Sequence, residues 1–272
     1  MPTLSSETTP MSKTALVTGA SSGIGAAAAE LLAQNGWSVW GLSRRGSAPS
    51  GVRGVSGDIT DPDSVRQVLS EIDSVSGRLD LLVNCAGSGI SGAVEFTAEE
   101  DSRRQMAVNL DGTAAVCRAS LPLLRKSRGM ILNVSSVAAV LPIPFQTWYS
   151  ASKAALNAYS SALANELRPF GVRVSAVMPG DIKTGFTAAR EKSPVGDDVY
   201  CGRISRSVEK MERDEQNGMP PQAVAKKILR LSGRKRVPPV CTVGAGYAAL
   251  VFLSRLLPRR LVNRILYLMY AK

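Results

Sequence analysis

Histidine is absent from this chain of 272 residues, and cysteine is scarce. Without histidine, the chain can form neither a Ser-His-Asp or Cys-His catalytic arrangement nor a metal site with histidine ligands. The four cysteines, at positions 85, 117, 201 and 241, lie far apart and form no Cys-x-x-Cys pair. We therefore expect neither a disulfide framework nor a metal site, and this cysteine usage indicates a reducing, cytoplasmic environment.

Acidic residues are missing from the C-terminal fifth of the chain. Between Ala223 and Lys272 there are eleven basic residues and no Asp or Glu. The other positions hold 22 basic residues, which is 33 minus 11, and all 22 acidic ones. The whole net charge of +11 therefore belongs to this stretch, which indicates a local partner and not a globally basic protein.

The rest of the composition is that of a folded protein. Hydrophobic residues make up 44% of the chain, which is enough for a sizeable core and excludes a disordered or low-complexity protein. Residues 1–12 are polar and lack the apolar segment of a secretory signal. We expect them to form a flexible N-terminal arm.

From Lys13 onward, short apolar runs alternate with segments of helical periodicity. Strands are predicted at 15–18, 37–42, 79–83, 130–134, 172–177 and 240–243, and helices at 26–34, 64–74, 99–124 and 150–167. Strands that alternate with helices of this length are typical of βαβ crossovers. The sequence thus predicts an α/β fold over residues 13–243, a Rossmann-type doubly wound parallel sheet with helices on both faces.

Residues 184–221 break this alternation, because they are polar, charged and interrupted by Pro and Gly. An insertion on the carboxyl side of a strand is where α/β folds place elements that cover a substrate. The segment is therefore interpreted as a substrate-covering insertion, with a solvated connection of no further role as the alternative.

A glycine-rich turn, Thr18–Gly25, follows the first predicted strand and opens a helix. Glycines allow a sharp turn and let the backbone approach a pyrophosphate, and the helix N-terminus offers N–H groups to that anion. A turn of this kind after the first strand of an α/β chain predicts a dinucleotide site.

The end of the second predicted strand reads Ser43-Arg44-Arg45. In dinucleotide folds an acidic residue at this place holds the ribose 2′-hydroxyl of NAD, whereas Arg accommodates the 2′-phosphate of NADP. A hydroxyl followed by two guanidinium groups suits a phosphate monoester and indicates NADP. The alternative is that both arginines are merely solvated.

Tyr149 and Lys153 are four residues apart on a predicted helix, so both side chains lie on one face. A free phenol has a pKa of about 10, which makes it a poor proton donor or acceptor near neutrality. A neighbouring ammonium and a cationic nicotinamide both favour the phenolate and are expected to lower that pKa.

Together these motifs resemble the short-chain dehydrogenase/reductase family. The resemblance runs from about Lys13 to Thr184 and rests on several motifs in the right order. They are the turn Thr18–Gly25, Asn84-Cys85-Ala86-Gly87, Asn109, Ser135-Ser136, Tyr149-x-x-x-Lys153 and Pro179-Gly180. The family's usual Asn-Asn-Ala-Gly appears here with Cys85 at its second position, which leaves a side-chain contact at that position in doubt.

The resemblance implies catalytic roles for Asn109, Ser136, Tyr149 and Lys153. Tyr149 would give a proton to a carbonyl oxygen or take one from an alcohol, and Ser136 would hold that oxygen; Ser135 is the weaker candidate for this serine. Lys153 would bind the nicotinamide ribose, and Asn109 would hold a water that links Lys153 to solvent.

The resemblance also implies a set of residues that contact the dinucleotide. The phosphates would be cradled by Gly19, Ser21, Ser22, Gly23, Ile24 and Gly25, and the 2′-phosphate would be bound by Ser43, Arg44 and Arg45. The adenine would be contacted by Asp58 and Ile59, and the adenosine side by Asn84, Ala86 and Gly87. The nicotinamide side would be contacted by Tyr149, Lys153, Pro179, Gly180, Ile182 and Thr184.

The C-terminal residues 244–272 are predicted to form two basic amphipathic helices, at 248–257 and 259–269. Residues 237–254 are uncharged, but their Pro and Gly residues make a membrane-spanning helix improbable. An apolar face bordered only by Arg is typical of a helix on an anionic membrane surface. The alternative is that both helices pack on their own domain or on a sister subunit. A nucleic-acid partner is not expected, because no recognised binding motif is present.

The leading hypothesis is an NADP(H)-dependent oxidoreductase that acts on a carbonyl or secondary alcohol. Its substrate is expected to be a lipophilic small molecule, of a steroid, retinoid or acyl-chain kind, because of the apolar C-terminal elements. The resemblance implies a homodimer or homotetramer formed through the helices that carry Asn109 and Tyr149. The alternative function is a non-catalytic NADP-binding scaffold or sensor at a membrane surface.

Overall fold

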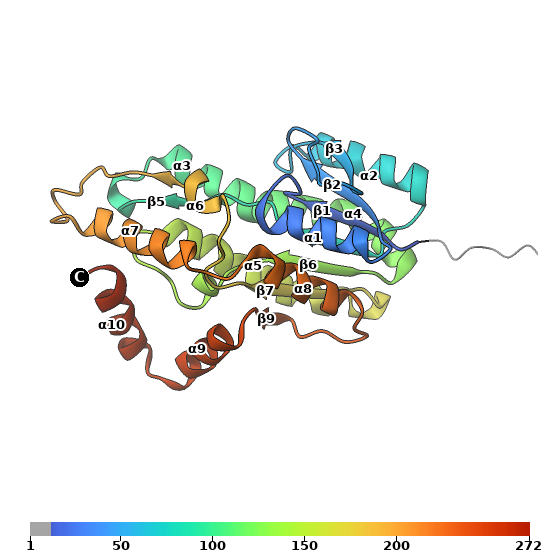
Figure 1. The fold of residues 1–272 in the computed structure, drawn as a ribbon. Helices are drawn as coiled ribbons and strands as arrows, with labels where there is room; N and C mark the ends of the chain where they lie inside the picture. Colours follow the sequence, from blue (N-terminus) through green and yellow to red (C-terminus); the bar gives the residue numbers. More distant parts are fainter. Residues whose placement is uncertain (1–11) are drawn as a thin grey trace, which may run out of the picture.

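The computed structural model describes residues 12–272, so the expected arm at 1–12 lies outside the described residues apart from Ser12. A parallel sheet forms the centre of the molecule, with strand order β3-β2-β1-β4-β6-β7-β9 (Figure 1). The strands are β1 (Thr14–Thr18), β2 (Ser38–Ser43), β3 (Arg53–Ser56), β4 (Leu81–Asn84), β6 (Met130–Val134), β7 (Arg173–Met178) and β9 (Val240–Thr242). The predicted Rossmann-type α/β fold is confirmed.

The central strands form because their residues are apolar on both faces. Every residue of β1, β4 and β6 is buried, as expected of strands that helices cover on both sides. Sequence analysis missed β3, the edge strand, in which only Val55 is buried. An edge strand with one inward side chain has no apolar run to detect.

Helices cover both faces of the sheet (Figure 1). The helices α1 (Gly23–Gln34) and α8 (Pro221–Ser232) pack against each other and share one hydrophobic core with the sheet. The helices α2 (Pro62–Ser76), α4 (Thr113–Ser127) and α5 (Thr147–Glu166) contribute to a second core on the other face. Short 3-10 turns lie at Val94–Phe96, Val137–Ala139 and Arg168–Phe170.

The single helix predicted at 99–124 is wrong in detail. It is divided into α3 (Glu99–Met106), a π-helical segment (Ala107–Gly112) and α4. The apolar periodicity continues through the π-helical segment, so the sequence pattern does not reveal this segment. The chain is closely packed there, because a Cβ on Gly112 would lie 2.9 Å from the Ile59 side chain.

The predicted insertion at 184–221 contains regular structure. It holds α6 (Phe186–Ala189), α7 (Arg203–Gln216) and the short strand β8 (Glu191–Lys192), which pairs with β5 (Ile90–Ser91) in a second sheet. The segment is thus fastened to the loop that follows β4, at the carboxyl ends of the central strands.

Two helices end the chain, α9 (Ala245–Leu256) and α10 (Arg259–Tyr270), and they stand out from the body (Figure 1). One side of the pair is anchored, because Val251 and Leu266 are buried against Leu141 and Met178. Val262 and Tyr270 are partly buried against the same cluster, and most of the other large apolar side chains of the pair are exposed. Within residues 12–272, no helix has the length and apolar character needed to span a membrane.

Candidate active site

The motif residues meet where the central parallel strands end. The main-chain N–H groups of Cys85 and Ala86 donate to the Thr18 hydroxyl at 3.1 and 3.2 Å, which joins the ends of β1 and β4. The N–H of Val137 donates to the Pro179 carbonyl at 2.9 Å and joins the turns after β6 and β7. In open α/β folds this carboxyl edge is where ligands bind.

Ser136 and Tyr149 face each other, whereas Ser135 faces away. The Ser136 hydroxyl accepts from the Ala138 N–H at 3.1 Å and lies close enough to the Tyr149 phenol to lower its pKa. Both residues are partly exposed. Ser135 is buried, and its hydroxyl donates to the Lys153 carbonyl at 3.1 Å. Of the two serines, Ser136 is therefore the one placed to share a substrate oxygen with Tyr149.

Lys153 is held below the same phenol. Its ammonium donates to the Val134 carbonyl at 2.9 Å and lies 5.7 Å from the centre of the Tyr149 ring. Only 6% of the residue is exposed. Gly87 lies beside this ammonium and Asn109, because a Cβ there would lie 3.6 Å from the Lys153 Nζ and, more tightly, 3.2 Å from the Asn109 Oδ1.

Burial shifts the pKa values of both members of the pair. Burial lowers the pKa of Lys153 to about 8. Burial also raises the pKa of Tyr149 to about 12, while the Ser136 hydrogen bond and Arg190 lower it and the Glu215 and Asp181 charges raise it. The lowering expected from a neighbouring ammonium together with a cationic nicotinamide stays a prediction for the site with the dinucleotide bound. At neutral pH the phenol is protonated.

Asn109 lies in the π-helical segment and is fully buried. Its side chain accepts from the Ser88 N–H at 2.9 Å and donates to the Ser88 carbonyl at 3.1 Å and to the Ser152 hydroxyl at 3.0 Å. Both amide protons are thereby used. The side chain thus ties the loop after β4 to the helix of Tyr149 and Lys153, and it has no donor left for a water.

The glycine turn has the shape of an anion cradle. A Cβ on Gly19 would lie 2.8 Å from the Ala86 nitrogen, and one on Gly25 would lie 2.2 Å from the Gly19 oxygen. The first turn of α1 has no side-chain cap at Ser22 and no acidic residue. Its N–H groups and positive dipole therefore point to an anion, and these residues fit the pyrophosphate of a nicotinamide dinucleotide.

The end of β2 presents two exposed cations, Arg44 and Arg45. Ser43 is buried, and its hydroxyl donates to the Ser47 carbonyl at 2.9 Å, so this side chain is already engaged. Hydrogen bonds from the N–H and hydroxyl of Thr60 lower the pKa of Asp58, and Arg44 lowers it further. Asp58 therefore lies near Arg44 while it also stabilises its own turn.

Several predicted cofactor residues have side chains in the core. The Asn84 amide donates to Asn133 at 2.9 Å, and both residues are buried. The side chains of Ile59 and Ile182 belong to the two hydrophobic cores. At these three positions only the main chain is available to a ligand at the strand ends.

The loop after β7 lies over the glycine turn. The Thr184 Cβ would be 3.5 Å from a Cβ on Gly23, so residues 180–184 and the start of α1 are neighbours. Pro179 is buried, and Gly180 lies under the ring of Tyr247 from α9. The residues predicted on the nicotinamide side are thereby brought together with those predicted to hold the phosphates.

Sequence analysis missed a group of side chains around Tyr149. The ring of Phe186 lies 5.8 Å from the Tyr149 ring. Arg190, only 4% exposed, is ion-paired with Glu215 and lies over the Phe186 ring. Asp181 accepts a hydrogen bond from Tyr247. Only Asp181, which directly follows the Pro-Gly motif, had a sequence signal that could have revealed it.

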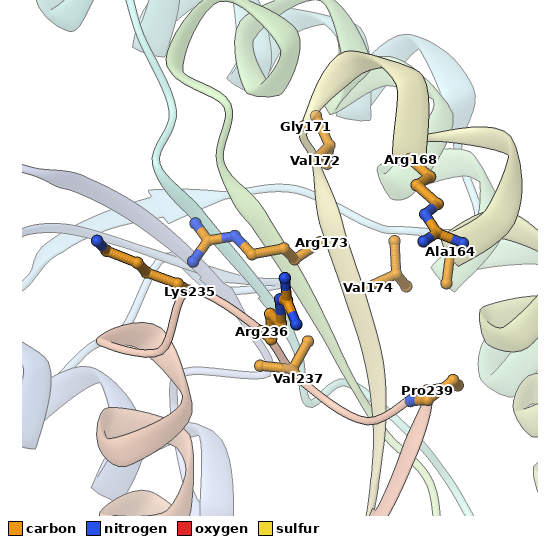
Figure 2. A pocket seen from close by; sticks show the side chains of 10 residues that line it. All are labelled: Ala164, Arg168, Gly171, Val172, Arg173, Val174, Lys235, Arg236, Val237 and Pro239. Carbon is orange, nitrogen blue, oxygen red and sulfur yellow. The ribbon is translucent and has the colours of Figure 1, made fainter.

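A basic hollow lies away from these residues, beside the amino-terminal end of β7 (Figure 2). Its volume is about 540 Å³, and its lining includes Arg168, Arg173, Lys235 and Arg236. None of the predicted site residues lines it. Of the C-terminal cations, Lys235 and Arg236 line this hollow, whereas α8, α9 and α10 carry most of the others.

Comparison with known proteins identifies the family. Residues 13–194 match the family model of the short chain dehydrogenases. The chain is 41% identical to a 3-ketodihydrosphingosine reductase of Bacteroides thetaiotaomicron, over 94% of this chain and 97% of the relative. It is 34% identical to a serine 3-dehydrogenase of Agrobacterium fabrum, over 71% and 82%.

A solved structure agrees with this assignment. A short-chain dehydrogenase from Streptomyces avermitilis has a TM-score of 0.83 and 30% identity to this chain, with 94% of this chain and 96% of that one covered. The relatives are reductases and dehydrogenases. The chain therefore belongs to the short-chain dehydrogenase/reductase family and is an NAD(P)-dependent oxidoreductase that acts on carbonyl or CH–OH groups.

Proposed function

We propose that the protein is an NADPH-dependent reductase of a long-chain 3-ketosphingoid base. The observation that carries this proposal is the extent of the likeness to the 3-ketodihydrosphingosine reductase, which spans 261 residues. The family model ends at residue 194, so that likeness must also include much of the C-terminal region. In α/β enzymes of this kind, the chain beyond the dinucleotide motifs is where substrate specificity is built.

Proton transfer is assigned to Tyr149. With its pKa raised to about 12, mainly by burial, the phenol starts as an acid at neutral pH, which favours reduction over alcohol oxidation. Bound nicotinamide dinucleotide supplies the hydride that adds to the carbonyl carbon. The Tyr149 proton passes to the carbonyl oxygen as its negative charge develops, and the phenolate then regains a proton from solvent.

Ser136 and Lys153 support that step. The Ser136 hydroxyl, beside the phenol, donates to the same carbonyl oxygen and stabilises its developing charge. Lys153 uses one donor on the Val134 carbonyl and keeps two more for ribose hydroxyls. Asn109 positions the Ser88 loop and α5. The alternative of a non-catalytic scaffold requires the loss of part of this set, and all four residues are present.

The preference for NADPH is assigned to Arg44 and Arg45. Both are exposed at the end of β2, and the position that would carry the acidic residue of an NAD site is Ser43. Two guanidinium groups match the charge and geometry of a 2′-phosphate, which NAD lacks.

The helices α9 and α10 are assigned to an anionic membrane surface, from which a lipophilic substrate can enter. Phe252 and Leu256 of α9 are 61% and 66% exposed, and Leu261 and Leu268 of α10 are also exposed. Arg255, Arg259, Arg260 and Arg264 flank them, with no acidic residue in either helix. Apolar side chains bordered by Arg suit the interface of an anionic bilayer. The alternative, in which both helices pack against protein, accounts only for the side of the helix pair that holds Val251 and Leu266.

Assembly as a homodimer or homotetramer through α4 and α5 is part of the same proposal. It rests on the family resemblance of these helices, and a partner subunit on them leaves α9 and α10 free for a membrane.

Product identification tests the function. The purified protein is incubated with NADPH and 3-ketodihydrosphingosine in detergent micelles, and the lipid is analysed by mass spectrometry. The expected result is dihydrosphingosine in equal molar amount to the NADPH consumed. Failure to reduce this ketone, with turnover of steroid or retinoid ketones under the same conditions, would overturn the proposed substrate class.

A further inference from the structure

The basic hollow beside the amino-terminal end of β7 is a second concave site of the molecule. Its volume of about 540 Å³ is typical of small-molecule pockets. β7 runs from Arg173, which lines the hollow, to Met178, which precedes the Pro179 turn. The hollow and the candidate active site therefore lie at opposite ends of one strand, and the proposed reaction does not use the hollow.

Among the residues that the structure describes, four cations and no carboxylate line this hollow. Arg168 follows α5, Arg173 begins β7, and Lys235 and Arg236 belong to the loop between α8 and β9. Figure 2 shows these four side chains around the first residues of β7. Within residues 12–272, none of the four forms an ion pair with Asp or Glu. Three segments of the chain thus bring unpaired positive charges to one hollow.

Arg173 has a fixed position in this group. Its guanidinium donates to the Arg234 carbonyl at 2.6 Å and to the carbonyls of Arg128 and Gly129 at 3.3 and 3.4 Å. Carbonyl oxygens carry no formal charge, so these bonds orient the guanidinium and leave its positive charge in place. An anion that enters the hollow therefore meets a cation whose position is already set, which lowers the entropic cost of binding.

The other three cations are free to move onto a ligand. Arg168, Lys235 and Arg236 are exposed, and in the described part of the chain their side chains donate no hydrogen bond. Lys235 and Arg236 belong to the C-terminal charge excess but lie outside α9 and α10. Membrane contact by those two helices therefore leaves the charge of this loop unexplained.

The chemistry of the lining indicates the class of ligand. Guanidinium and ammonium groups match the charge and the oxygens of phosphate groups. Val172, Val174 and Val237 add apolar surface, and no aromatic side chain within residues 12–272 lines the hollow. Single-stranded nucleic acids are held by stacking on aromatic side chains. A concave site also concentrates the field of its charges on a small anion. The lining thus favours a small phosphorylated group over a nucleic acid.

We propose that this hollow binds a phosphate group, which Arg173 meets in a fixed position and which the exposed cations around it close upon. The site goes beyond the proposed function and does not depend on it, because no residue of the candidate active site lines the hollow. A phosphate group is offered both by dissolved phosphate compounds and by the headgroups of anionic lipids, and these two sources are separated by experiment.

Inorganic pyrophosphate is the probe for the dissolved source. Its binding is measured by isothermal titration calorimetry at constant ionic strength, with the protein saturated with NADPH so that the dinucleotide site is filled. The wild type is compared with the double variant Arg168→Gln with Arg236→Gln. This variant is expected to bind pyrophosphate at least about 10-fold more weakly, because two charge-assisted hydrogen bonds are lost. An affinity equal to that of the wild type would overturn the dissolved source.

The matched control removes the same charge from another part of the surface. Arg66→Gln with Arg103→Gln replaces two arginines of α2 and α3 that Asp63 and Glu99 pair. Because the net charge falls equally in both double variants, the control should bind pyrophosphate like the wild type. Equal weakening in both double variants would show an effect of net charge alone and would contradict the assignment.

Vesicles of phosphatidylcholine that contain phosphatidic acid are the probe for the lipid source. If the hollow takes a lipid headgroup, Arg168→Gln with Arg236→Gln should bind these vesicles at least about 10-fold more weakly than the control variant. If it takes a dissolved compound, that variant should lose pyrophosphate and still bind the vesicles like the control. Unchanged binding of both probes would refute the phosphate site.

Thermal unfolding and quenching of protein fluorescence by NADPH verify that each variant is folded and binds the dinucleotide. If Arg168→Gln with Arg236→Gln does not fold, Lys235→Gln with Arg236→Gln replaces it, since both of these residues lie in one exposed loop. The same weakening is expected of this second variant. Binding of pyrophosphate and of the vesicles as in the control would then overturn the proposal.

Discussion

The first two thirds of the chain and the C-terminal third differ in how much apolar surface they expose. Up to Pro179, the central strands are buried, and Asn109 is held by hydrogen bonds to Ser88 and Ser152. After Pro179, large apolar side chains such as Phe252 and Leu256 are exposed along α9 and α10. In the proposed function, the first region provides the chemistry common to the family, and the second binds the substrate and the membrane surface.

Substitutions at the predicted cofactor site of the first region should have the larger of the two effects that test this comparison. Replacing Arg44 and Arg45 together by Ala should raise the KM for NADPH by about 10- to 100-fold, because two charge-assisted hydrogen bonds to phosphate are lost. The KM for NADH should change little. Initial rates with both dinucleotides measure the effect.

The matched control for the cofactor is Arg103→Ala, which removes an exposed guanidinium paired with Glu99 on α3. It should leave both KM values unchanged. An undiminished preference for NADPH in the Arg44 and Arg45 variant would show that the end of β2 does not bind the 2′-phosphate.

The exposed side of the second region gives a smaller effect. The wild type should sediment with anionic vesicles at low salt and be released as salt rises. The double variant Phe252→Ser with Leu256→Ser should bind the vesicles about 10-fold more weakly, because two apolar side chains no longer enter the interface. Neutral vesicles should bind less of either protein.

An equally exposed pair elsewhere provides the control for the vesicles. Phe170→Ser with Val75→Ser removes two exposed apolar side chains outside α9 and α10 and should sediment like the wild type. Absence of binding to anionic vesicles at low salt would favour the alternative in which the two helices pack against protein. Size-exclusion chromatography of the α9 variant would then reveal a lost subunit contact.

The two regions also differ in how far sequence predicts them. The strands β1, β4, β6 and β7 were predicted because burial on both faces leaves an unbroken apolar run. Tyr149 and Lys153 were predicted from their spacing on one helix, and Ser136 was predicted from the resemblance to the family. The sequence did not reveal that the side chains of Asn84, Ile59 and Ile182 lie in the core, since a motif position does not show which way its side chain points.

The residues that sequence analysis missed depend on contacts between distant segments. Arg190 and Glu215 meet across α6 and α7, and Asp181 meets Tyr247 of α9. No periodicity or motif encodes such pairs, because each member is an ordinary polar residue in its own segment. The raised pKa of Tyr149 has the same origin, since its main cause is burial by the assembled fold.

The central claim, that a protonated Tyr149 delivers the proton to the substrate carbonyl, is tested most directly by the kcat of Tyr149→Phe with NADPH and 3-ketodihydrosphingosine. Removal of a general acid should lower kcat by about 100- to 10,000-fold, while NADPH titration shows an unchanged dissociation constant. A kcat within about threefold of the wild type would contradict the account.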